Sequence, residues 1–255
     1  MHNIHMAEFT EEFSQCWNVA GSHIQRMAGG ELMSWLKATL APPFLEHLSF
    51  RLGNQLFFIQ IEDEDGQLEV PGSPDGLMAI AEGCNGHACL MPMQKQGGRW
   101  LTTAPGWGLI DAETRRAIDP ISFVSDEKIE MTDWELQDFA VQVVRDDLKK
   151  AGRELMSWNG NPEVLPSIWF VGNDGPEWVI VRSYRFPDED EGLPENIEEI
   201  KAQLRKVSTK GNYAAVGIAD MTEMFSMDNI DSDEAPAIYR GHGLNVTYEG
   251  LRSIT

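Results

Sequence analysis

The strongest constraint on the fold is an internal repeat. The segment AGGELMSW, which starts at Ala28, returns as AGRELMSW from Ala151, and seven of its eight residues are identical. The spacing of 123 residues is close to half of the 255-residue chain, and each half has the size of an ordinary domain. The repeat therefore predicts one structural unit written twice, provided that other features match in the same order.

The segments before the two repeats correspond as helices. Thr132 and Glu135 have the spacing of a capping box, and Thr10 takes the place of Thr132 in the first half. Apolar residues at helical spacing follow each threonine and continue to Trp35 and Leu155, inside the repeated segments. Each half is therefore predicted to begin with an amphipathic helix that includes the repeat.

The later parts of the halves also correspond. Aromatic and β-branched runs flank a Gly-Asn pair at Gly53 and again at Gly172, which predicts a β-hairpin in each half. A helix and a further strand follow, with Ser73 as the N-cap of the first of these helices. A Gly-x-Gly-Leu motif then begins at Gly106 and at Gly241. The shared order predicts an α-β-β-α-β(β) unit in each half.

The predicted fold class is α+β, formed by tandem duplication of this unit. The chain has no parallel βαβαβ series with nucleotide-binding turns, which argues against a doubly wound sheet. We place the first repeat at residues 8–123, a linker at 124–131 and the second repeat at 132–255. Two copies of one unit are expected to pack with pseudo-twofold symmetry, as the subunits of a homodimer do. Six tryptophans are expected mainly in the two cores: Trp17, Trp35, Trp134, Trp158, Trp169 and Trp178.

Charge is the clearest guide to partners. The formal net charge is −21, and both halves are acidic. Such a field repels phosphate backbones and anionic lipids, and the chain lacks basic-aromatic surfaces, so neither nucleic acid nor membrane is expected as a partner. A basic protein partner is expected instead, with the chain itself a monomer or small homo-oligomer.

Each predicted hairpin runs into four consecutive acids followed by glycine. The first tetrad is Glu62, Asp63, Glu64 and Asp65, and the second tetrad is Asp188, Glu189, Asp190 and Glu191. Such a run is usually a solvated loop, but two runs at corresponding places also suit a contact surface for a basic partner. The tetrads are therefore the predicted partner-binding residues. They lack the alternating ligand spacing of an EF-hand calcium loop.

Three soft donors lie close together in the first half. Cys84, His87 and Cys89 could supply ligands to Zn²⁺, although no second pair stands at zinc-finger spacing. On a strand, His87 and Cys89 would share one face with Met91 and Met93, which would suit Cu(I) or simply a buried strand. Three cysteines do not make a disulfide framework, and no cofactor is predicted.

The Gly-x-Gly motifs place an aromatic residue between glycines. Trp107 in the first motif is expected to cap a core. His242 in the second could serve as a catalytic base, but the sequence identifies no Ser, Cys or Asp beside it. The chain contains no GxGxxG after a strand, no GxxxxGK[ST], no HExxH and no GxSxG. A non-catalytic protein is therefore favoured over an enzyme.

The first functional hypothesis is an acidic binding protein that docks a cationic protein, as small inhibitors, immunity proteins and secretion chaperones do. The alternative is a metal-dependent hydrolase. The helix, hairpin, helix and strand resemble the core of the PD-(D/E)xK nucleases, whose strands carry an acid and an acid-x-lysine pair that hold Mg²⁺. The corresponding runs LFFIQIED and EWVIVRSY lack the lysine. A self-assembling scaffold is the third hypothesis.

The expected location is the cytoplasm. The first residues, MHNIHMAEFTEEF, contain no apolar core of a signal peptide, and no run approaches the length of a membrane span. Unpaired cysteines are consistent with a reducing compartment.

Overall fold

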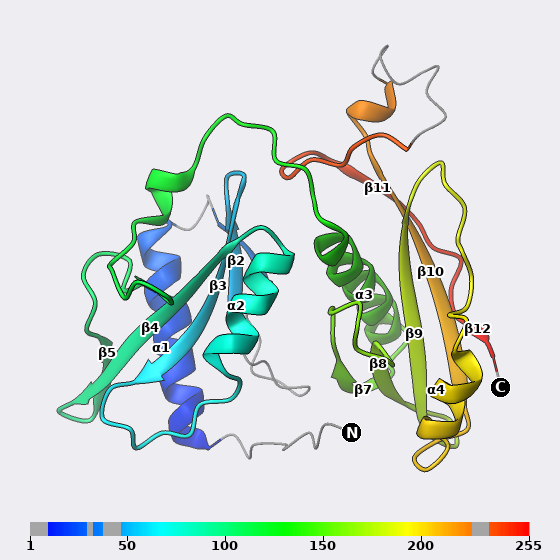
Figure 1. The fold of residues 1–255 in the computed structure, drawn as a ribbon. Coiled ribbons are helices and arrows are strands. Elements are labelled where there is room, and N and C mark those ends of the chain that lie inside the picture. Colours follow the sequence, from blue (N-terminus) through cyan, green and yellow to red (C-terminus); the bar gives the residue numbers. More distant parts are fainter. Residues whose placement is uncertain (1–9, 30–32, 38–46, 226–234, 255) are drawn as a thin grey trace. The chain divides into compact units, whose positions relative to one another are not determined.

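The computed structural model describes residues 10–29, 33–37, 47–225 and 235–254. The chain divides into two compact units, Met1–Glu127 and Lys128–Thr255, and this boundary falls within the segment expected as a linker. Residue 8, the expected start of the first repeat, lies outside the described residues. The described parts form an α+β protein with four α-helices and two mixed sheets (Figure 1).

The first unit contains two α-helices and six strands among its described residues. In chain order these are α1 (Glu11–Met27), β1 (Met33–Lys37), β2 (Leu48–Leu52), β3 (Gln55–Asp63), α2 (Pro74–Gly83), β4 (His87–Gln96), β5 (Arg99–Thr102) and β6 (Ile110–Asp111), followed by the 3-10 helix η1 (Pro120–Phe123).

The second unit has the same order of α-helices and strands among its described residues. They are α3 (Asp133–Lys150), β7 (Glu154–Trp158), β8 (Ile168–Gly172), β9 (Gly175–Arg185), α4 (Ile197–Leu204), β10 (Gly211–Asp220), the 3-10 helix η2 (Glu223–Phe225), β11 (Leu244–Thr247) and β12 (Arg252–Ser253).

The two sheets also have the same strand order. The first runs β1-β2-β3-β4-β5 with β6 on β4, and the second runs β7-β8-β9-β10-β11 with β12 on β10. In each, one parallel pair, β3 with β4 or β9 with β10, is joined through a helix, and the other pairs are antiparallel. The one-residue irregularity at Trp35–Lys37 in β1 recurs at Leu155–Ser157 in β7.

The repeated segment is the end of a helix and the strand after it, so the prediction of one helix through it was wrong. Gly29 and Gly152 adopt positive φ angles of 69° and 74°, which only glycine tolerates easily, and the helices end just before them. The following ELMSW of the second copy is β7. Each unit therefore has three strands, not two, between its helices.

The predicted helix caps are confirmed, and so is the first of the two predicted hairpin turns. The hydroxyls of Thr10, Ser73 and Thr132 each accept a backbone N–H at a helix start, and Glu135 completes the capping box. The first predicted turn, Gly53-Asn54, joins β2 and β3. The second lies one residue later than predicted, at Asn173-Asp174, because Gly172 pairs with Gly175.

The two Gly-x-Gly motifs do not occupy equivalent places, contrary to the alignment drawn from the sequence. Gly106-Trp107-Gly108 precedes β6, which pairs with the start of β4. Gly241-His242-Gly243 precedes β11, which pairs with the end of β10. Trp107 is buried and stacks on Phe50 with ring centroids 6.2 Å apart, as expected of a core cap.

Helices cover both faces of the second sheet (Figure 1). On the α3 face the core includes Val141, Val144, Val179 and Val181. On the α4 face Ile200 packs with neighbours that include Trp178, Ile180 and Tyr213. Because side chains alternate along a strand, β9 contributes odd residues to one core and even residues to the other.

The tryptophan prediction holds for part of the set. Trp17 and Trp178 are almost fully buried, whereas Trp134, Trp158 and Trp169 are half-buried. The side chain of Trp35 lies outside the described part of the chain. No helix among the described residues is long and apolar enough to cross a bilayer.

A buried ion pair fixes the start of α3. The Arg240 guanidinium donates to both carboxylate oxygens of Glu135, at 2.9 Å each, and the two side chains are 1% and 7% exposed. Glu135 also accepts the backbone N–H of Thr132. The pair therefore joins the first turn of α3 to the loop before β11, 105 residues away.

Breaking this pair should destabilise the second unit. Arg240→Met leaves a buried carboxylate without its cation, and we expect the free energy of unfolding to fall by about 3–5 kcal/mol. Adding Glu135→Gln removes the charge but keeps the capping bond, so the double variant should recover part of the loss. Urea denaturation of the full chain measures the change, and hydrogen exchange of α3 locates it. Equal stability of Arg240→Met and wild type would contradict the role given to the pair.

Candidate functional site: an acidic cavity in the second unit

The first tetrad is largely used within its own unit. Both carboxylate oxygens of Glu62 accept hydrogen bonds from Arg115, at 3.0 and 2.6 Å. The Asp63 carboxylate accepts three backbone N–H groups of the loop that follows β3, and Asp65 accepts the Gln94 amide at 3.3 Å. The hydrogen bond from Arg115 to Glu62 raises the pKa of the guanidinium. Only Glu64 of this tetrad is left without such a contact among the described residues.

The second tetrad leaves more of its charge available. Asp190 accepts hydrogen bonds from the Tyr213 hydroxyl and from the backbone N–H of Gly192. Burial, followed by the contact with Asp190, raises the pKa of Tyr213. The carboxylates of Asp188, Glu189 and Glu191 are exposed and form no hydrogen bond or ion pair with the residues that the structure describes. One acid therefore anchors the loop while three remain free to meet a ligand.

The second tetrad lines a cavity of about 920 Å³, which we call the acidic cavity. Its other walls come from the first turns of α3, the end of β9 and the loop that leads into α4. Six carboxylates line it, namely Asp133, Asp188, Glu189, Asp190, Glu191 and Glu195, with two guanidiniums, Arg182 and Arg185. The excess of acids favours a cationic ligand.

One of the two arginines is already neutralised. Arg185 lies 3.1 Å from Glu130 and 3.2 Å from Asp133, and it also donates to the carbonyl of Met131. Apolar contacts in the cavity come mainly from Pro162, Leu193 and Pro194, since Leu136 is almost fully buried. The cavity thus combines free carboxylates with a smaller apolar surface.

A smaller cavity of about 320 Å³ shares Tyr184 and Asp190 with the acidic cavity. It is also lined by Tyr213, Glu249 and Arg252, whose guanidinium lies 5.0 Å from the centre of the Tyr213 ring. The two shared residues place this cavity directly beside the acidic cavity.

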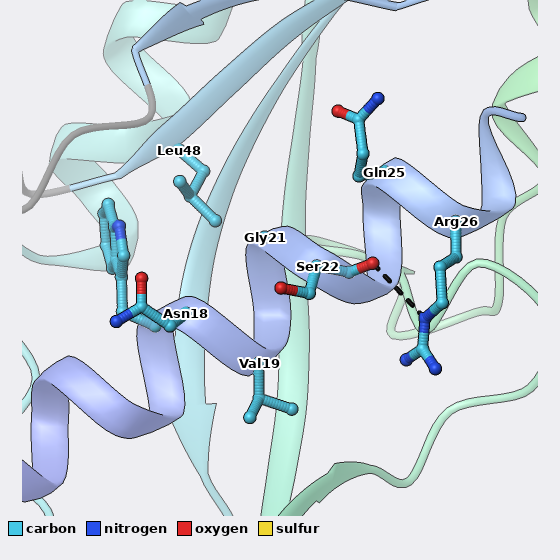
Figure 2. Close-up of a pocket in the computed structure, with 8 residues that line it drawn as sticks. Asn18, Val19, Gly21, Ser22, Gln25, Arg26 and Leu48 are labelled. Carbon is cyan, nitrogen blue, oxygen red and sulfur yellow. Dashed lines mark hydrogen bonds between the residues drawn. The ribbon is translucent and has the colours of Figure 1, made fainter. Parts of the chain in front are cut away.

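The first unit has a cavity of different chemistry. It measures about 770 Å³ and is formed by α1 and the start of β2 (Figure 2). Among the residues that the structure describes, its lining includes Trp17, Gln25, Arg26 and Leu48 but no carboxylate. Arg26 Nε donates to the Ser22 carbonyl at 3.4 Å, as the dashed line in Figure 2 shows. The one charged side chain among the described lining residues is that of Arg26, which repels a cation.

The three soft donors of the first unit belong to its packing. Cys84 is the buried C-cap of α2, and Cys89 is buried within β4, where its thiol donates weakly to the His87 carbonyl. His87 Nε2 lies 3.0 Å from Gln55 Oε1. Burial raises the pKa of the Cys89 thiol. Burial also raises the pKa of the Cys16 thiol, to about 12. Among the described residues, no group of three His, Cys, Asp or Glu side chains is placed to hold a metal ion.

The structure places an aspartate beside His242, which sequence reasoning missed. His242 Nδ1 lies 2.8 Å from Asp220 Oδ2, and Asp220 is fully buried. Asp220 also accepts backbone N–H groups from Thr222, Glu223 and Tyr239. Burial raises the pKa of Asp220, but these hydrogen bonds and His242 outweigh it, so the pKa is lowered. The available signal was an acid that ends the apolar run YAAVGIAD.

The hydrogen bond to Asp220 determines which tautomer the neutral His242 ring adopts. An ionised carboxylate only accepts hydrogen bonds, so Nδ1 must carry the proton, and Nε2 of the neutral ring is the acceptor. The arrangement has the orientation of a general base, but no Ser, Thr or Cys side chain is hydrogen-bonded to His242 among the described residues. The pair therefore ties the end of β10 to the turn before β11.

Comparison with known proteins extends to the second unit alone. Residues 134–254 match a family described as a domain of unknown function (DUF8840). No curated protein and no solved structure matches the chain. The matched region contains the second tetrad and the Asp220–His242 pair, and it includes no residue of the first unit.

The lowered pKa of Asp220 gives a pH-dependent prediction. A carboxylate with a lowered folded-state pKa stabilises the fold above its ordinary pKa of about 3.9, and this stabilisation is lost as pH falls through the folded-state value. Asp220→Asn leaves buried N–H donors poorly satisfied and should cost about 1–3 kcal/mol at pH 7. The difference in free energy of unfolding between Asp220→Asn and wild type should become smaller below about pH 4. Chemical denaturation from pH 7 to pH 3 measures this, with the exposed Asp126→Asn as control. A gap that stays constant with pH would contradict the assignment.

Proposed function

We propose that this protein is a non-catalytic binding protein that docks a basic segment of a partner protein in the acidic cavity. The observation that carries the proposal is that Asp188, Glu189 and Glu191 line this cavity without partners among the described residues. The net charge of −21 supports it, because a field of that sign accelerates encounter with a cationic protein. The proposed setting is the cytoplasm.

The two tetrads are proposed to contribute unequally. Arg115 neutralises Glu62, and the loop after β3 occupies Asp63, so a partner would have to displace existing bonds to use the first tetrad. The second tetrad offers three exposed carboxylates. We therefore assign the main contact to the second tetrad and a secondary contact to Glu64.

Charge reversal tests this assignment. The triple variant Asp188→Lys, Glu189→Lys, Glu191→Lys spares Asp190, which anchors the loop, and should lose at least tenfold in partner capture from extract. Its matched control is Asp126→Lys, Glu154→Lys, Glu199→Lys, which changes the net charge equally at exposed sites outside the cavity. Capture is read by mass spectrometry at low and high salt, because screening weakens such contacts. Equal capture by the two variants would refute the cavity as the docking site.

We also propose that the chain arose by tandem duplication and that its units pack with pseudo-twofold symmetry. The shared order of α-helices and strands, the shared strand order and the shared bulge in β1 and β7 support the duplication. We expect residues 124–255 expressed alone to fold with the stability of the second unit in the full chain. Failure of this fragment to fold would count against an independent second repeat.

The alternatives make different demands on the protein. A nuclease-like hydrolase requires Mg²⁺-dependent cleavage by the purified chain. A self-assembling scaffold requires a large oligomer in light scattering, whereas the binding protein is expected to be a monomer or small homo-oligomer.

A further inference from the structure

We infer that the basic partner segment binds as an added β-strand along the free edge of β9. This inference rests on the proposed function and specifies how the acidic cavity recognises its ligand. It starts from the unequal lengths of β8 and β9. The pairing of β8 with β9 ends at Val179, whereas β9 pairs with β10 on its other side as far as Arg185.

The backbone groups of this edge can be assigned from the pairing. Trp178 and Phe186 donate their N–H groups to carbonyls on the β10 side, those of Lys210 and Ile218. Because backbone groups alternate along a strand, the odd-numbered residues Val181, Ser183 and Arg185 direct theirs to the opposite, free edge. Beyond Val179, β9 therefore has a neighbouring strand on the β10 side only.

Side chains, not a strand, now occupy the edge. The Gln137 amide donates to the Val181 carbonyl at 2.9 Å and accepts the Ser183 N–H at 3.1 Å. The Val181 N–H donates to the Ser167 hydroxyl at 3.2 Å. One donor and one acceptor on Gln137 thus reproduce the pair of bonds that a neighbouring strand would form, and a peptide can replace them.

The acidic cavity lies along this edge. It is lined by four consecutive β9 residues, Arg182 to Arg185, whose side chains alternate between the two faces of the sheet. Gln137, which bonds to the backbone of Val181 and Ser183 at this edge, also lines the cavity, so the cavity borders the edge. The first turns of α3 border it from one face, and the second tetrad borders it from the loop that leads to α4.

The lining selects the chemistry of the added strand. Exposed carboxylates of the second tetrad would meet basic side chains, and the half-buried Pro162 and Leu193 would meet apolar ones. An added strand presents alternate side chains to opposite faces, so a segment that alternates basic and apolar residues satisfies both walls. The cavity borders β9 from Arg182 to Arg185, so about four residues of an added strand, roughly 13 Å, can lie along it.

The test uses a capped octapeptide of alternating lysine and valine, whose Kd for the full-length protein is measured by fluorescence polarisation. Two further versions carry N-methyl groups on the valine amides or on the lysine amides. All three have the same charge and length. In an added strand, alternate backbone N–H groups point to the sheet, so only the valine amides or only the lysine amides bond to β9. One methylated peptide should therefore bind at least tenfold more weakly than the other.

The outcomes separate this inference from the proposed function. If all three peptides bind equally and the triple lysine variant of the second tetrad binds none, the acidic cavity binds by charge and strand addition is overturned. If that variant binds the unmodified peptide as wild type does, the cavity assignment itself is overturned. Failure of the unmodified peptide to bind wild type overturns strand addition, and capture from extract then tests the proposed function separately.

Gln137 supplies a second readout. Gln137→Ala removes the side chain that the peptide must displace, so binding should tighten by about threefold to tenfold. Gln142→Ala is the matched control, because this glutamine lies on the same helix and bonds to Asp138 instead. Hydrogen exchange at Ser183 and Arg185 should slow in the complex. Unchanged or weaker binding by Gln137→Ala contradicts the displacement.

Discussion

The buried pair of Glu135 and Arg240 determines where α3 begins and how it lies on the second sheet. Two opposite charges inside a protein lose their hydration and are tolerated only when they satisfy each other closely. Here the guanidinium meets both carboxylate oxygens, and Glu135 also caps the helix. Gln137 stands two residues further along the same turn. The pair that positions the helix therefore also positions the amide that covers the free edge of β9.

The two acidic tetrads show how the same residue types acquire different chemistry. In the first unit, Glu62 is paired with Arg115, and Asp63 accepts backbone N–H groups of the loop after β3. In the second unit, a single acid, Asp190, holds the loop through Tyr213 and Gly192. The remaining acids stay exposed on the wall of a cavity. Two units with the same strand order can thus differ in how much acidic charge they leave exposed.

The acidic side chains of the cavity lie beside the strand edge of β9 that β8 leaves unpaired. An uncovered strand edge invites uncontrolled pairing, and proteins guard such edges with charge or with side chains that occupy the backbone groups. This edge has both guards, the second tetrad and Gln137. In the proposed mode of binding, the same features that discourage neutral or acidic strands would favour a basic one.

The sequence by itself determined the helix caps, the first hairpin turn, the α+β class and the acidic tetrads, because these depend on residues close together along the chain. Periodicity could not show that ELMSW becomes a strand, since the glycine before it ends the helix only through its backbone angle. Tertiary structure alone decided which acids remain free. Arg115 reaches Glu62 across 53 residues, and Asp220 reaches His242 across 22. Such contacts depend on which strands become neighbours, and the packing of the sheet decides that.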